Sequence, residues 1–182
     1  MPFNKQALIP MTEYESAAPD VRARYEAQIA RHGRITNMKR TMLHSPKVFD
    51  VYMEWYALHD LLVPIIGARG VSLFSYAISS GNDCLICSTF FRKILIDNGD
   101  DPDHPNLTAQ EQLLIDFGKA FSISPHRIPQ RLYDQLQAQF THEQQVLLIG
   151  FAGQMTATNL FNTVAKVPLD EVLYSYQKTE GR

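Results

Sequence analysis

The chain has 182 residues, of which 45% are hydrophobic and 20% are charged, and its formal net charge is −2. This length suits one domain with a sizeable core, and the composition is that of an ordinary globular protein. A charge so close to zero excludes a general electrostatic attraction to nucleic acid or to anionic lipid. We therefore expect no nucleic-acid partner and look for function in local features.

Neither the apolar stretches nor the N-terminus predicts a membrane protein or an exported one. The longest apolar stretch, residues 146–164, contains glycine and several polar residues, which favours a buried core helix over a membrane span. The first residues, Met1 to Gln6, lack the basic start and the apolar run of a signal peptide. We expect a cytoplasmic protein with no membrane partner and no transmembrane segment.

Helix signals begin near the N-terminus. Residues 20–31 carry apolar side chains at four-residue steps, with a proline just before them and a glycine just after, and this pattern predicts an amphipathic helix. We assign residues 1–35 to an N-terminal extension that packs on a single helical domain, the whole chain forming one domain over residues 1–182.

The next helix is expected to start at Ser45-Pro46, since serine caps helices well and proline fits the first helical position. Pro64 is expected to end it, and Gly67 to Gly70 are expected to form a break. The buried stripe of this helix is predicted to consist of Val48, Val51, Trp55, Leu58 and Leu62.

A short apolar helix over residues 71–80 leads into the turn Gly81-Asn82-Asp83. Asn82 or Asp83 is expected to cap the following helix, because either side chain accepts hydrogen bonds from free helical amides. That helix is predicted to carry both cysteines in its first turn and to end at Asn98-Gly99, a left-handed stop.

The second half of the chain is also predicted to be helical. Residues 100–106 form a polar connector, and a helix is expected near residues 129–140. Thr108 to Glu111 and Thr141 to Gln144 are capping boxes that open two further helices, the second of which runs to about Lys166. No window alternates in the manner of a strand, so the predicted class is all-α with about seven to eight helices.

Cys84 and Cys87 are the only cysteines of the chain. In a reducing cytosol, a pair this close is more often catalytic, redox-sensing or metal-binding than a structural disulfide. A helix start lowers the pKa of a thiol because the amide dipoles favour the thiolate. Residues three apart in a first turn lie on one side, so one sulfur can attack the other after oxidation. Cys84 and Cys87 are therefore our catalytic candidates.

Two other interpretations of the cysteines stay open. A structural zinc site needs four ligands, and the six histidines are scattered with none paired at ligand spacing, so we expect no metal and no other cofactor. The pair can also consist of ordinary buried residues, since cysteine packs well in cores. Trp55, Phe74, Phe90 and Phe91 are candidates for the wall of an apolar pocket, with core packing as the alternative for each.

Several segments, taken in order, resemble a known superfamily. They are the run from Asn37 to Pro46, the motif from Gly81 to Cys87, residues 107–111, residues 140–144 and residues 159–162. Together with the helix before the dithiol, they are similar to the alkylhydroperoxidase D and carboxymuconolactone decarboxylase superfamily over most of the chain. The resemblance implies an all-helical domain that assembles into trimers or hexamers, with peroxidase or disulfide reductase activity in members that keep both cysteines.

The resemblance also implies a proton relay that this sequence lacks. Members with peroxidase activity have a glutamate twelve residues before the first cysteine, a histidine directly before the second, and another histidine four residues after it. At the matching positions stand Ser72, Ile86 and Phe91. We therefore do not expect hydroperoxide reduction through that relay, whereas slower dithiol exchange remains compatible with the sequence.

The leading hypothesis is a thiol-dependent oxidoreductase that uses Cys84 and Cys87 to reduce a small hydroperoxide or a disulfide. The resemblance implies that the second cysteine faces the peroxide. Return to the dithiol requires an external donor such as a thioredoxin-like or lipoyl protein, since no dinucleotide or flavin fingerprint is present. The alternatives are a non-redox enzyme of the carboxymuconolactone decarboxylase kind and an oligomeric binding protein without catalysis.

Overall fold

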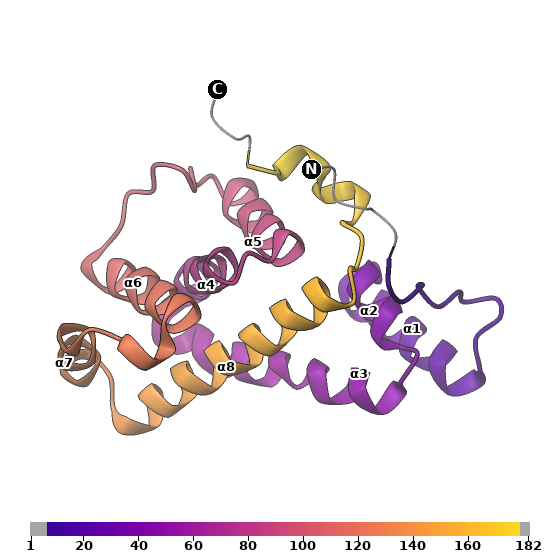
Figure 1. Ribbon diagram of the computed structural model, residues 1–182, viewed down its shortest axis with the longest axis horizontal. Coiled ribbons are helices and arrows are strands. Elements are labelled where there is room, and N and C mark those ends of the chain that lie inside the picture. The colour runs from indigo at the N-terminus through magenta and orange to yellow at the C-terminus, as the bar shows by residue number, and fades with distance from the viewer. Residues whose placement is uncertain (1–6, 179–182) are drawn as a thin grey trace.

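The computed structural model describes residues 7–178. Over this part of the chain it contains eight α-helices, two short 3-10 helices and no β-strand (Figure 1), which confirms the all-α prediction. The α-helices are α1 Pro19–His32, α2 Asn37–Met42, α3 Pro46–Met53, α4 Trp55–Gly81, α5 Leu85–Asp97, α6 Ala109–Ile123, α7 Gln130–Gln139 and α8 His142–Val164. The 3-10 helices are η1 Pro125–Arg127 and η2 Glu171–Tyr176.

Helix α4 lies at the centre of the fold and packs against α5, α6 and α8 (Figure 1). Phe74 of α4 is fully buried and stacks on Phe117 of α6 and Phe151 of α8, with ring centroids 6.1 and 6.0 Å apart. Burial of each such side chain stabilises the fold by about 1.5–3 kcal/mol. This cluster fixes α8 against α4 and so sets the distance of α8 from the cysteines.

Helix α4 continues past Pro64, contrary to the prediction that this proline ends a helix. Leu62 and Ile66, on either side of the proline, are buried in the core, and their packing outweighs the lost backbone hydrogen bond. The break comes at Gly67, whose φ of 74° and ψ of 157° are essentially open only to glycine. The predicted break is therefore reduced to one residue, after which the helix continues.

The predicted stripe of the helix that starts at Pro46 is wrong in its first turn. Glu54 separates α3 from α4, so the residues before and after it do not share one face. Val48 and Val51 are exposed, whereas Phe49 is buried. The larger aromatic side chain takes the inward position, and this turns the two valines toward solvent.

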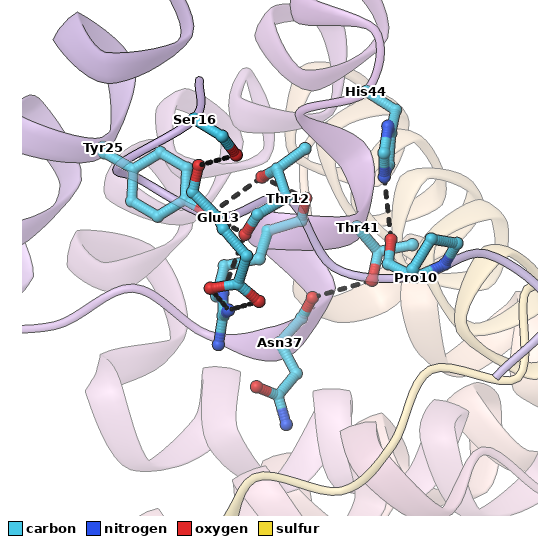
Figure 2. Close-up of polar contacts among 9 residues, drawn as sticks. Pro10, Thr12, Glu13, Ser16, Tyr25, Asn37, Thr41 and His44 are labelled. Carbon is cyan, nitrogen blue, oxygen red and sulfur yellow. Dashed lines mark hydrogen bonds and ion pairs between the residues drawn. The ribbon is translucent and has the colours of Figure 1, made fainter. Parts of the chain in front are cut away.

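A second, smaller hydrophobic cluster joins α1, α2 and α3. Its buried members are Val21, Tyr25, Met42, Leu43 and Phe49. The segment before α1 is tied to it, because Oγ1 of Thr12 lies 2.8 Å from the hydroxyl of Tyr25 and Nε2 of His44 lies 2.8 Å from the carbonyl oxygen of Pro10 (Figure 2). That residues 1–35 are an N-terminal extension stays a prediction, and their first six residues lie outside the described part.

The two predicted capping boxes and the predicted stop after α5 are confirmed. Thr108 and Thr141 accept hydrogen bonds from the backbone of the third residue of α6 and of α8. Glu111 and Gln144 bond back to the capping residues, so both capping boxes are complete. Helix α5 is followed by Gly99 with a φ of 88°, the expected left-handed stop.

The stretch Pro46–Gly81 is long and apolar enough to cross a membrane, judged by length and composition alone. In this fold it forms α3 and α4, and 56% of its most apolar window is buried among the described residues. Its apolar side chains therefore serve the core, as in the central helix of a soluble protein. Location in the cytoplasm stays a prediction.

Candidate functional site

The two cysteines lie at the junction of α4 and α5. Helix α4 ends at Gly81, Asp83 adopts a left-handed conformation with a φ of 53°, and α5 begins at Leu85. Cys84 is the N-cap residue of α5 and Cys87 lies in its first turn. The dithiol at a helix start is confirmed, although Cys84 precedes the first turn in which it was expected. The backbone N–H of Cys87 donates a hydrogen bond to Sγ of Cys84 at 3.4 Å.

The capping residue is not the one predicted. Asn82 and Asp83 are the expected caps, but the sulfur of Cys84 takes that place. Because the left-handed residue Asp83 completes the turn, Cys84 is the first residue with the extended backbone that a cap needs. The amide of Asn82 instead donates to Oδ1 of Asn159 at 3.0 Å and to Oγ1 of Thr156 at 3.2 Å, both on α8.

Helix α8 supplies the polar groups around the sulfurs. Nδ2 of Asn162 donates a hydrogen bond to Sγ of Cys87 at 3.1 Å. One turn earlier, Nδ2 of Asn159 donates to Oγ of Ser79 at 3.3 Å, and both asparagines are buried. From the sequence, these asparagines are only polar interruptions of an apolar helix. The signal that could have found them is their three-residue spacing, which places both on the buried face.

The two thiols ionise unequally, and the first proton is lost from Cys84. The pKa of Cys84 is lowered, mainly because the Cys87 thiol donates a hydrogen bond to it, while burial opposes the shift. The pKa of Cys87 is raised well above its usual value by that hydrogen bond and then by burial. Both are free thiols and are only 2% and 5% exposed. The first thiolate therefore forms on Cys84, at the positive end of α5.

A cavity of about 260 Å³ opens beside the dithiol. Cys87 belongs to its wall, whereas Cys84 does not. The aromatic part of the wall includes Trp55, Phe90 and Phe91, as predicted. Phe74, expected there as well, lies in the core between α6 and α8. Cys87, the cysteine in the cavity wall, is thus the one with the higher pKa.

None of the three relay positions carries an acid or a base. The hydroxyl of Ser72 donates to the carbonyl of Ala68 at 3.0 Å, and Ile86 and Phe91 line the cavity with hydrocarbon. Each thiol has its pKa shifted by the other cysteine and by burial. The remaining shifts come from amide and hydroxyl side chains of α8. Within residues 7–178, no group of three or more histidine, cysteine or acidic side chains is placed to hold a metal ion.

Comparisons with known proteins support the fold. No family model matches the chain, and no curated protein matches it. The crystal structure of an alkylhydroperoxidase AhpD core, an uncharacterized peroxidase-related protein from Ralstonia eutropha JMP134, is 18% identical and superposes with a TM-score of 0.69, covering 92% of this chain and 94% of that one. A peroxidase-related protein from Silicibacter sp. TM1040 is 14% identical with a TM-score of 0.74, covering 95% and 96%.

A third solved structure, the debrominase Bmp8 without ligand, is 15% identical with a TM-score of 0.71, covering 93% of this chain and 95% of that one. The chain therefore has the fold of the alkylhydroperoxidase AhpD core, in agreement with the resemblance in the sequence. At such low identity the likeness shows the fold alone. The chemistry has to be argued from the residues of the site.

Proposed function

We propose that this protein is a thiol-dependent oxidoreductase that reduces a small hydroperoxide or a disulfide with Cys84 and Cys87. The observation that carries the proposal is the position of Cys87 in the wall of an apolar cavity, with the sulfur of Cys84 capping the same helix turn. The names of the structural neighbours, which include an alkylhydroperoxidase core and a peroxidase-related protein, support it. A cytoplasmic location and a homo-oligomeric state belong to the same proposal.

Cys84 assists Cys87, the cysteine in the cavity wall, by accepting its proton. The proton of Cys87 passes to Cys84 along their hydrogen bond, which leaves a thiolate facing a hydroperoxide R–O–OH. This thiolate attacks the terminal oxygen, so an S–O bond forms and the O–O bond breaks. The leaving alkoxide takes the proton from Cys84 and departs as R–OH.

The second half of the cycle closes the disulfide. The thiolate now on Cys84 attacks the sulfur of the Cys87 sulfenic acid, an S–S bond forms, and hydroxide leaves and takes up a proton as water. The two thiols have then given two electrons to the peroxide, and the products are R–OH, water and a disulfide. An external dithiol, such as a thioredoxin-like or lipoyl protein, returns the pair to its reduced form by exchange.

The absence of the relay sets the expected rate. No hydrogen bond joins a carboxylate or an imidazole to either sulfur within residues 7–178, so proton transfer depends on the two thiols and on the amide of Asn162. Positioned acids and bases commonly contribute about a hundredfold or more to such reactions. We therefore expect slow reduction of hydroperoxides. Reduction of a small disulfide by dithiol exchange is the second reaction that we propose for the same pair.

A single-turnover experiment tests this function. Reduced protein is mixed with tert-butyl hydroperoxide or with a small disulfide, and the remaining thiols and the mass of the chain are followed. Both thiols should disappear together with formation of one intramolecular disulfide. Cys84→Ser and Cys87→Ser should each abolish turnover, whereas Ser88→Ala, in the same helical turn, should keep it.

Other outcomes point to the alternatives. Full turnover in either cysteine variant would overturn the dithiol mechanism. Enzymatic conversion of a lactone or carboxylate substrate that survives alkylation of both thiols would favour the non-redox chemistry of the carboxymuconolactone decarboxylase kind. Thiols that stay unreactive in the folded protein up to alkaline pH would favour a binding protein with inert cysteines.

A further inference from the structure

A buried cation, Lys39 of α2, belongs to the wall of the same cavity as Cys87. Lys39 is 4% exposed, and its Nζ donates hydrogen bonds to the hydroxyl of Tyr56 at 2.9 Å and to Oε1 of Gln28. Both partners are neutral, and none of the ion pairs formed within residues 7–178 includes Lys39. Because an ammonium group has three N–H bonds, one is left for a ligand.

Beside the neutral Gln28, the charged and titratable groups that act on Lys39 from α1 and the segment after it are positive or basic. Burial, followed by the charges of Arg31 and Arg34, lowers the pKa of Lys39 to about 8. His32 stacks on Tyr56 with ring centroids 4.7 Å apart, and burial lowers its pKa as well. Arg34 and His32 both line the cavity. This end of the cavity therefore lacks a negative charge to match Lys39.

Among residues 7–178, Asp170 is the only carboxylate in the cavity wall. Its Oδ1 accepts the backbone N–H of Asn37 at the start of α2, at 2.9 Å, and burial raises its pKa. The charge of Asp170 acts on Arg34 and Arg40. Among the described residues, Lys39 therefore has the ring of Tyr56, 5.0 Å from its Nζ, but no anionic partner. The rest of the wall is mainly hydrocarbon, from side chains such as Ile86 and Met155. The cavity thus combines one buried cation with an apolar body.

We infer that the cavity binds a small apolar carboxylic acid as its anion, with the carboxylate on Lys39 and the apolar body along the wall that contains Cys87. The reacting group on that body, a hydroperoxide or a disulfide, rests on the proposed function, whereas the anion site does not. A buried ammonium without an anion is costly, and charge-assisted hydrogen bonds to a carboxylate offset that cost.

Binding of the anion and protonation of Lys39 are linked. Lys39 holds its proton at neutral pH and releases it above a pKa of about 8, so affinity for a carboxylate should fall roughly tenfold per pH unit beyond that point. The Cys84 thiol beside the cavity also ionises at a lowered pKa, so the pH series is run on the Cys84→Ser/Cys87→Ser double variant, in which no thiol can mimic this fall. Tyr56 and His32 do not mimic it either. The pKa of Tyr56 is raised above 10.0 and that of His32 lowered below 6.5.

Fluorescence gives a test that does not depend on redox activity. Trp55 is the only tryptophan of the chain and lines the cavity, so its emission reports occupancy. The probes are octanoate and the neutral octanamide, which has the same apolar body. Octanoate should bind at least about tenfold more tightly to the protein at neutral pH, which corresponds to one charge-assisted hydrogen bond. Lys39→Met should remove that preference, and Lys47→Met, the same change at an exposed lysine, should keep it.

Each outcome of these measurements supports or overturns one of the two proposals. Equal affinity for the two probes, or a preference that survives in Lys39→Met, would overturn the anion site. If Lys39→Met does not fold, as circular dichroism would show, the pH dependence of octanoate binding to the Cys84→Ser/Cys87→Ser double variant decides instead. A fall above pH about 8 supports the anion site, and a constant affinity up to pH about 10 contradicts it. Octanoate binding without turnover of any hydroperoxide or disulfide would overturn only the proposed function. Equal rates of turnover with acidic and with neutral hydroperoxides would overturn only the anion site.

Discussion

Asn162 donates a hydrogen bond from its Nδ2 to Sγ of Cys87 at 3.1 Å, and so connects α8 to the first turn of α5. The asparagine is buried, and its Oδ1 has no partner among the described residues. An amide donor favours a thiolate over a thiol, so Asn162 acts to lower the pKa of both cysteines. We regard Asn162 as a positioning residue for the sulfur that faces the cavity.

Replacement of Asn162 by leucine removes this donor and keeps the number and branching of the heavy atoms of the side chain. A hydrogen bond to a charged group contributes about 1.5–3 kcal/mol, so the pKa of the first thiol should rise by about one unit or more. Reaction with iodoacetamide at neutral pH should then slow roughly tenfold, as measured by mass spectrometry. Asn106→Leu, at an exposed site, is the matched control. An unchanged rate in Asn162→Leu would mean that the amide does not support the thiolate.

The reduced pair should ionise in two well separated steps. The pKa of Cys84 is lowered and that of Cys87 is raised well above its usual value, so the ultraviolet absorbance of the first thiolate should appear below the range of a free cysteine, about 8.5. The second thiolate should appear well above it. Cys87→Ala should move the remaining step upward, because the Cys87 thiol is the main hydrogen-bond donor to Cys84. Two overlapping steps near the ordinary value would contradict this assignment.

Features set by neighbouring residues could be predicted from the sequence. The capping boxes at Thr108 and Thr141 and the helix start that carries the cysteines each depend on residues within one turn. The order of these helices along the chain also led to the fold that the solved structures share. The stop at Gly99 followed for the same reason, because a left-handed residue after a helix is a local signal.

Features set by contacts between distant segments could not be predicted in this way. The meeting of Asn162 with Cys87 depends on how α8 packs on α4, and no local pattern marks it. Pro64 stays inside a helix because the core holds its neighbours. Lys39 looks like an ordinary surface residue in sequence, and only the tertiary structure places it beside the cavity. Polar residues recruited from other helices are the part of the site that local signals miss.

An apolar stripe on α8 remains exposed in the single chain. It contains Val146, Ile149, Leu160 and Val164. These positions share one face of the helix, and such a stripe is typical of an interface between copies, so we expect a homo-oligomer. The resemblance to the superfamily implies a trimer or hexamer. Leu160→Glu should lower the molecular mass measured by light scattering toward that of one chain, whereas Ile123→Glu, an exposed site on α6, should not. A monomeric unaltered protein would refute the expectation.

Lys39 should also make the stability of the protein depend on pH. Its pKa is about 8 in the folded chain, below its ordinary value of 10.5. Below about pH 8 both the folded and the unfolded chain hold the proton, and burial of the ammonium lowers the free energy of unfolding by about 3 kcal/mol. Between the two pKa values the unfolded chain holds more protons, so stability rises with pH until this penalty is gone.

Comparison of the unaltered protein with Lys39→Met isolates this effect, because methionine has a similar length and no charge. The free energy of unfolding is measured by urea denaturation at pH about 7 and about 10. The variant also loses two hydrogen bonds, so the readout is the change with pH: relative to the variant, the unaltered protein should gain stability as pH rises. Lys47→Met should show no such change, and octanoate should stabilise the unaltered protein at neutral pH through linkage. A difference that stays constant with pH would show that burial does not penalise the ammonium of Lys39.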